Sequence, residues 1–104
     1  MEGKYFFLKL IPPRPGFAFD MTASERQAMQ LHVQYWTDLT KAGTAIIFGP
    51  VMDPVAPYGI CIVEVEGEDS ARRLAAEDPA ITEGTGCTYE LLPMRVGLIR
   101  GMVM

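Results

Sequence analysis

The chain has 104 residues and a net charge of −4, with 49% hydrophobic and 21% charged residues. Its length suits one domain over residues 1–104, and its composition is typical of globular proteins. The acidic balance, without a basic patch, disfavours nucleic-acid binding. The apolar runs are far shorter than the roughly 20 residues that a membrane span needs. The opening "MEGKYFFLKL" does not resemble a signal peptide, so we expect a globular protein that binds neither nucleic acid nor membranes.

The chain contains two cysteines, Cys61 and Cys87, whose spacing matches no metal-binding motif. We expect both to be free, buried thiols in a reducing compartment, and therefore a cytoplasmic location. The strand context of Cys61 disfavours an exposed, nucleophilic thiolate. Because there is also only one histidine, a zinc site is not expected. We expect no metal and no cofactor.

The first half of the chain predicts a strand, a loop and a helix. "KYFFLKLI" (4–11) is short, aromatic and apolar, which is typical of a strand. "PPRPGFAFDM" (12–21) cannot continue a ladder, because three prolines and a glycine interrupt it. In "TASE", Thr22 and Glu25 form a capping-box pattern that opens a helix. The helical period runs to Ala42, and Gly43 supplies the stop.

The second half predicts three more strands and a shorter helix. The expected elements are a strand at 44–49, a turn-rich connection at 50–57, a strand at 58–66, a helix at 68–78, a short helical turn and loop at 79–86, and a strand at 87–96. The last segment, "GLIRGMVM" (97–104), is apolar and either adds an edge strand or exchanges onto a partner.

The order β-α-β-β-α-β predicts an α+β, ferredoxin-like fold with a four-stranded antiparallel sheet and both helices on one face. In the first strand, apolar side chains occur on both faces: Phe6 and Leu8 point one way, and Tyr5 and Phe7 the other. Two helices cover only one face. We therefore expect a homodimer in which two sheets pack face to face. The alternative is that the 12–21 loop and the C-terminal tail cover the second face.

His32, in the stretch "QLHVQYW", lies in the middle of the apolar side of the first helix. A polar ring in that position needs a hydrogen-bond partner. Asp78, in "AEDPA" at the end of the second helix, is the best placed carboxylate in this topology. Two structural interpretations remain open: a satisfied core histidine, and an aspartate that caps the helix beginning at Pro79. The second does not exclude pairing, because a carboxylate has two oxygens.

If the two residues pair, the carboxylate fixes the imidazole tautomer and stabilises the protonated ring. The other ring nitrogen then becomes the better base, particularly in a pocket that excludes water. His32 and Asp78 would form a general acid/base site.

Most of the chain is similar to the YciI-related (YCII) family, part of the dimeric α/β-barrel superfamily. The similarity covers "FAFDMTASERQAMQLHVQYWTDLTKAGTAIIFGPVMDP", "YGICIVEVEGEDSARRLAAEDPAI" and "YELLPM". It implies a ferredoxin-like fold that dimerises through its sheets and an active site built on a His–Asp dyad, here His32 and Asp78. At least one relative is a dehydrochlorinase that acts on a chlorinated hydroxyhydroquinone.

Two functional hypotheses follow. The first is a small, cofactor-independent lyase or isomerase that transfers a proton on a small aromatic or cyclic substrate, in the manner of a dehydrochlorinase. Its catalytic residues would be His32 and Asp78. The substrate pocket would be lined by Phe17, Phe19, Met21, Trp36, Gly49 and Pro50. The alternative is a non-catalytic, dimeric small-molecule-binding or structural protein, in which the His–Asp pair is a buried hydrogen bond.

Overall fold

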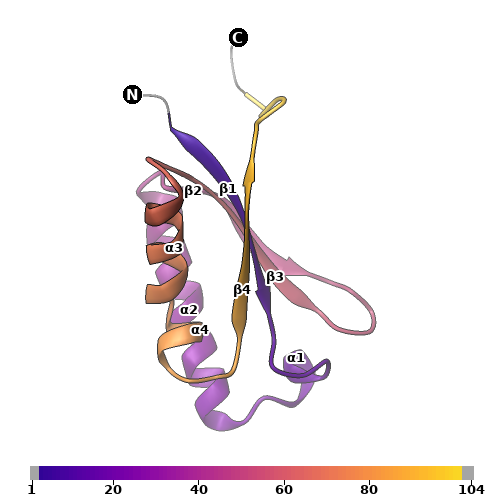
Figure 1. Ribbon diagram of the computed structural model, residues 1–104. Coiled ribbons are helices and arrows are strands. Elements are labelled where there is room, and N and C mark those ends of the chain that lie inside the picture. Colours follow the sequence, from indigo (N-terminus) through magenta and orange to yellow (C-terminus); the bar gives the residue numbers. More distant parts are fainter. Residues whose placement is uncertain (1–2, 102–104) are drawn as a thin grey trace.

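A computed structural model of the chain describes residues 3–101 (Figure 1). The elements in chain order are β1 (Lys4–Ile11), α1 (Phe17–Asp20), α2 (Ala23–Lys41), β2 (Ala45–Val51), β3 (Tyr58–Val65), α3 (Glu68–Glu77), α4 (Pro79–Thr82) and β4 (Thr88–Met94). Among residues 3–101, no helix combines the length and the apolar character needed to span a bilayer.

The four strands form one antiparallel sheet in the order β2-β3-β1-β4. The long helices α2 and α3 lie together on one face of this sheet, while the β2–β3 hairpin projects beyond the helix layer (Figure 1). Each half of the chain contributes a strand, a covering helix and a returning strand. The predicted ferredoxin-like α+β fold is therefore confirmed.

The N-terminus of α2 is fixed by the predicted capping box. The Glu25 backbone N–H donates to Thr22 Oγ1 at 3.2 Å, and the Thr22 backbone N–H donates to Glu25 Oε1 at 2.8 Å. The Arg14 guanidinium also donates to both Glu25 carboxylate oxygens, at 2.7 and 2.9 Å, and to Asp20 Oδ1 at 3.0 Å. This fork holds the segment before α2 against the helix end. At the other end, Gly43 has a φ of 88°, which glycine adopts readily.

Several boundaries differ from the sequence-based expectations. The segment 12–21 is not entirely loop, because Phe17–Asp20 forms the single turn α1. Strand β2 extends to Val51, through a proline that an edge strand tolerates. The tail does not add a strand within residues 95–101, and residues 102–104 lie outside the described part of the chain.

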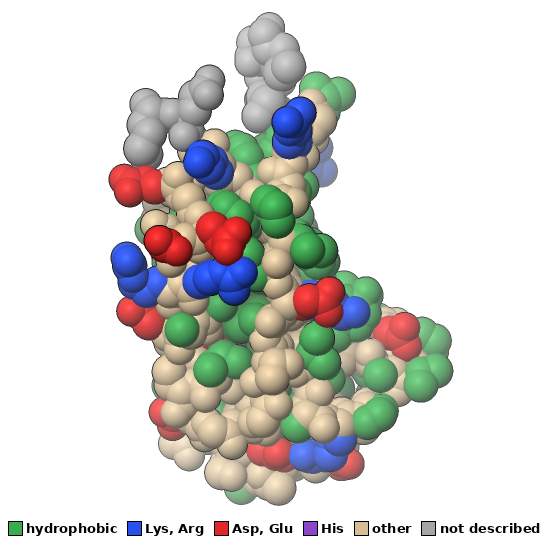
Figure 2. Space-filling view, viewed as in Figure 1, with side chains coloured by type: hydrophobic (Ala, Val, Ile, Leu, Met, Phe, Trp, Pro, Cys, Tyr) green, Lys and Arg blue, Asp and Glu red, His purple; other side chains and the backbone are tan. Residues whose placement is uncertain are grey.

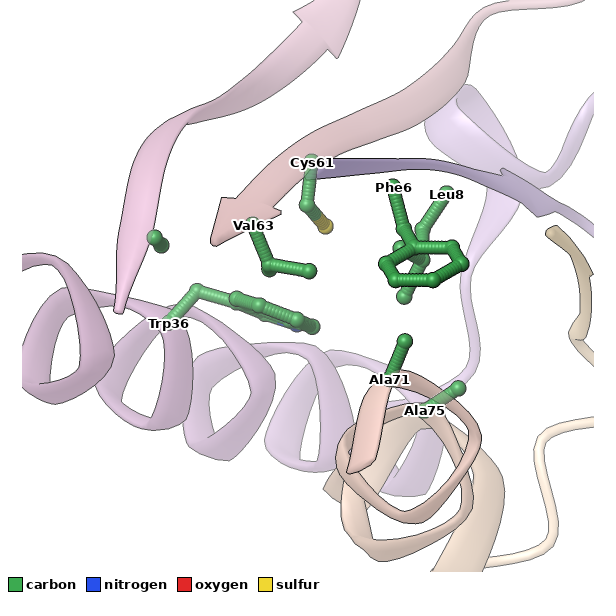
Figure 3. Close-up of a cluster of buried hydrophobic side chains, with 8 residues drawn as sticks. Phe6, Leu8, Trp36, Cys61, Val63, Ala71 and Ala75 are labelled. Carbon is green, nitrogen blue, oxygen red and sulfur yellow. The ribbon is translucent and has the colours of Figure 1, made fainter. Parts of the chain in front are cut away.

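The main hydrophobic cluster lies between the sheet and the two long helices (Figure 3). Trp36 of α2 and Ala71 and Ala75 of α3 point toward the side chains of β1 and β3. The two alanines allow α3 to approach the sheet closely. The buried members of this cluster are Phe6, Leu8, Trp36, Ala45, Cys61, Val63, Ala71 and Ala75.

The face of the sheet opposite the helices is also apolar. The register places Phe7 beside Ile62 on β3 and Leu92 on β4, while Ile47 on β2 is also opposite Ile62. Ile47 and Leu92 are each 53% exposed. Apolar side chains gather on the strand side of the molecule and over the projecting hairpin, as Figure 2 shows. Unlike the helix-covered face, this face has little cover from the described residues.

Candidate active site

Asp78 occupies the junction between two helices. It ends α3 and serves as the N-cap of α4, where Pro79 takes the first helical position. Its Oδ1 accepts a hydrogen bond from the Ala80 backbone N–H at 2.9 Å. The dipeptide Asp-Pro therefore begins a helix here, as its sequence pattern indicates. The side chain is 0% exposed, so its remaining lone pairs need partners from the protein.

Three side chains from two other elements supply those partners. His32 Nδ1 lies 2.8 Å from Asp78 Oδ2 and 3.0 Å from Oδ1. Trp36 Nε1, one helical turn further along α2, donates to Oδ2 at 2.9 Å. The Tyr89 hydroxyl of β4 donates to Oδ2 at 2.5 Å and lies 3.2 Å from Trp36 Nε1. The carboxylate thus joins α2, α4 and β4 through a fully paired network.

This network keeps Asp78 ionised. Burial alone would raise the pKa of its carboxyl group, but the hydrogen bonds and charge of His32, together with the bonds from Tyr89 and Trp36, lower the pKa below its ordinary value. Tyr89 responds in the opposite direction. Burial, followed by the neighbouring Cys61 and Asp78, raises the pKa of its hydroxyl, so Tyr89 stays protonated and donates. Asp78 is therefore a fixed negative charge behind the imidazole.

The second nitrogen of His32 has a different environment. Nε2 has no hydrogen-bond partner among residues 3–101, and none of the buried side-chain nitrogen and oxygen atoms in this region is unpaired. Nε2 is therefore accessible, although the side chain as a whole is only 12% exposed. His32 lines a cavity of about 280 Å³.

The cavity lies between α2 and the ends of β1, β2 and β3, and it is almost entirely apolar. No lysine, arginine, aspartate or glutamate lines it. The lining residues are Leu10, Pro12, Phe17, Ala18, Met21, Met29, His32, Val33, Phe48, Gly49, Pro50, Pro57, Tyr58, Gly59, Ile60, Cys61 and Cys87. An imidazole nitrogen beside such apolar walls can exchange a proton with a bound ligand.

The residues predicted for the pocket divide into two groups. Phe17, Met21, Gly49 and Pro50 line the cavity around His32. Phe19 and Trp36 do not. Phe19 is 73% exposed, because the single turn α1 directs Phe17 inward and Phe19 outward. Trp36 is 0% exposed and belongs to the packed core, where its indole donates to Asp78.

Sequence reasoning missed Tyr89 as a member of this network. Its strand alternates, with Tyr89 and Leu91 on the helix-covered face and Glu90 on the other. A tyrosine on a buried strand face needs a hydrogen-bond partner for its hydroxyl, and this requirement could have indicated that Tyr89 belongs to the network.

Both cysteines are free and buried within the described chain, and both line the cavity. Burial raises the pKa of the Cys61 thiol to about 12 and also raises that of Cys87. Both are therefore protonated at neutral pH and act as apolar walls. Among residues 3–101, no group of three metal-ligating side chains comes together.

The fold and the site define a small α+β domain with an imidazole–carboxylate pair at the edge of an apolar cavity. The chain belongs to the YCII-related domain family, whose model matches residues 5–95. No curated protein sequence matches the chain.

The fold resembles that of several solved structures. One is the 5-chloro-2-hydroxyhydroquinone dehydrochlorinase of Burkholderia phenoliruptrix in complex with 2,5-dihydroxybenzoquinone. It has a TM-score of 0.65 and 18% identity, over 88% of this chain and 95% of that one. Another is an uncharacterised protein of Thermotoga maritima, with a TM-score of 0.53 and 7% identity, over 91% of this chain and all of that one.

Proposed function

We propose that the protein is a cofactor-independent lyase or isomerase that transfers a proton on a small, uncharged aromatic or cyclic substrate. The observation that carries this proposal is the asymmetry of His32. One of its nitrogens is held by a buried carboxylate, whereas the other has no partner among residues 3–101, and the ring lines an apolar cavity. That arrangement suits a base with a fixed tautomer.

In the proposed reaction, Nδ1–H of His32 donates to Asp78 and Nε2 accepts a proton from the substrate. The negative charge of Asp78 stabilises the imidazolium that results. In an isomerase, Nε2 returns the proton at a second position of the substrate. In a lyase, the electron pair left on the substrate expels an anionic group, and the proton passes to solvent. The dehydrochlorinase that shares this fold makes the second outcome the first to be tested.

The test begins with a thermal-shift screen of small phenols, lactones and chlorinated aromatics, followed by turnover assays on the compounds that stabilise the protein. We expect His32→Ala to lower kcat/KM by about 10²–10⁴-fold, the usual contribution of a general base. Gln30→Ala, an exposed position two residues earlier on α2, is the matched control and should retain full activity. Full activity in both His32→Ala and Asp78→Asn would exclude the proposed mechanism.

The alternative is a non-catalytic ligand-binding or structural protein. It is favoured by the bonds from Trp36 and Tyr89, because these make Asp78 a junction between elements whether or not chemistry occurs. In that case His32→Ala lowers the free energy of unfolding by about 1–3 kcal/mol, the cost of leaving a buried group unpaired. No compound that binds to the wild type would then be turned over.

We also propose that the protein is a homodimer in which two uncovered sheet faces pack together. The helices occupy one face, and Ile47 and Leu92 on the other remain more than half exposed. Neither the 12–21 segment nor residues 95–101 covers them. The two free thiols support a reducing, cytoplasmic location.

A further inference from the structure

Gly59 is the second residue of β3 and is paired on both sides in the sheet, where a glycine packs no side chain and weakens the strand. The usual reasons for a glycine in a strand are a positive φ, a bulge or the close approach of another backbone. Gly59 is not among the positive-φ glycines, and its pairing with Leu10 and Pro50 is regular. A Cβ built at this position would lie 3.4 Å from Leu10 Cβ, which is ordinary van der Waals contact. Within residues 3–101, neither the backbone conformation, nor the strand pairing, nor a steric clash therefore requires glycine at this position.

The register places the missing side chain on the helix-covered face of the sheet. Pro50, Gly59 and Leu10 form one row across β2, β3 and β1, and all three line the cavity. Pro50 and Leu10 are thus separated by two strand spacings, roughly 9–10 Å. Met29 and His32 of α2 line the same cavity from the helix layer. The glycine leaves the β3 backbone bare in the floor of the cavity, between two larger neighbours.

The charges around the cavity restrict what can occupy it. None of the lining residues carries a charge at neutral pH other than His32 when it is protonated, and the Asp78 carboxylate lies directly behind that ring. An anionic ligand would lose its hydration without gaining a lysine or arginine partner. The volume of about 280 Å³ lies just below the usual range for drug-sized ligands, so a small compound with one ring fits the cavity.

We propose that Gly59 is a specificity-determining residue: its missing side chain lets an uncharged, single-ring ligand lie against the β3 backbone with one hydroxyl or carbonyl group directed toward His32 Nε2. This inference rests on the proposed function, since it takes the cavity to be the substrate site. It defines the substrate class by the number of rings and the absence of charge. It also attributes the choice between substrates to Gly59, which has no side chain to make a polar contact.

The experiment measures binding alone, by NMR titration of wild type, Gly59→Ala and Gly59→Val with phenol, catechol, hydroquinone and benzoate. Gly97→Ala is the matched control, because a Cβ at that exposed glycine meets nothing within 4 Å. We expect wild type and Gly97→Ala to bind the neutral rings and to bind benzoate at least tenfold more weakly. Gly59→Ala should weaken binding of the neutral rings at least fivefold, and Gly59→Val should abolish it.

Equal Kd values in wild type and Gly59→Ala overturn the inference, as does a wild type that binds none of the three neutral rings. If the Gly59 variants do not fold, NOEs from the bound ring to the Gly59 Hα protons in the wild type decide the question, and their absence rejects the proposal. Gly59-dependent binding without any turnover leaves this inference standing and rejects catalysis. Turnover that depends on His32 but not on Gly59 rejects this inference alone.

Discussion

The space between the sheet and the helices has two halves that differ in how they are filled. In one half, Leu8 and Val63 of the sheet and Trp36 of α2 are fully buried between the sheet and the two long helices. In the other, Leu10, Phe17, Ala80 and Cys87 form a smaller cluster around the cavity. The long helix α2 runs over both halves, and α3 adds cover over the first. In the second half, the single turn α1 lines the cavity and the single turn α4 contributes Ala80 to the buried cluster. The cavity therefore lies in the half that α3 does not cover, between α2, the single turn α1 and the ends of β1, β2 and β3.

The largest expected effect is at the boundary between the halves. Asp78→Ala removes a fully buried acceptor that binds His32, Trp36 and Tyr89. Of these donors, Trp36 would keep only its longer bond to the Tyr89 hydroxyl, and His32 Nδ1 would lose its acceptor. We expect a loss of about 4–5 kcal/mol in the free energy of unfolding, measured by urea denaturation. Asp38→Ala, at an exposed carboxylate on α2, should change it by no more than about 0.5 kcal/mol. A loss below about 1 kcal/mol for Asp78→Ala would contradict the idea that the carboxylate joins the two halves.

The comparison can be sharpened with two leucines on one strand. Leu8 and Leu10 lie on the same face of β1, the first in the packed half and the second on the cavity wall. Leu8→Ala should cost about 4 kcal/mol, because it opens a new void in a filled region. Leu10→Ala only enlarges an existing cavity and should cost about 2–3 kcal/mol. Guanidinium denaturation of both variants measures the difference, and equal losses would mean that the two halves are equally well packed.

The uncovered face of the sheet extends the comparison to a region with no helix layer. Introducing a charge there through Ile47→Glu or Leu92→Glu should convert a dimer into a folded monomer. Sedimentation velocity measures the mass, and circular dichroism checks the fold. Leu31→Glu is the matched control, because Leu31 is 45% exposed on α2, outside the proposed interface. A monomeric wild type would reject the proposed dimer.

The smallest expected effect concerns the segment that closes the cavity half. Hydrogen bonds from Arg14 lower the pKa of Glu25 from 4.5 to about 2. The folded chain therefore binds this proton less readily than the unfolded chain, so the stabilisation is complete above pH 4.5 and is lost as the pH falls toward 2. We expect the stability difference between wild type and Glu25→Gln to shrink over that interval in pH-dependent urea denaturation. A difference that stays constant down to pH 2 would argue against the ion pair as its source.

The order of elements could be predicted because its signals are local. Thr22 and Glu25 mark the start of α2, Gly43 marks its end, and alternation identifies β1 and β3. The one-turn helix α1 could not be predicted, because the Arg14 fork to Asp20 and Glu25 helps to hold it. Those contacts bridge six and eleven positions, beyond any helical or strand period.

The site was predictable only in part, for a related reason. Helical periodicity placed both His32 and Trp36 on the inward side of α2, but it did not distinguish a residue facing the cavity from one facing the packed core. Phe19 was predicted to line the pocket for the same reason as Phe17, namely an aromatic side chain in the 12–21 segment. Only the orientation of α1 determines that Phe17 is buried and Phe19 is exposed. The Tyr89 contact to Asp78 depends on how β4 lies beside α4, which no pattern within either segment specifies.

Trp36 and His32 are the only tryptophan and the only histidine in the chain, and both are bonded to the same carboxylate. Tryptophan emission will therefore report on one side of that carboxylate, and a single pair of imidazole NMR signals will report on the other. Solvent relaxation, quenching and ring-current shifts can all be followed without labels or engineered probes. The two intrinsic signals therefore report independently on the two sides of the Asp78 carboxylate, so that unfolding and the proposed ligand binding can be followed in one unlabelled sample.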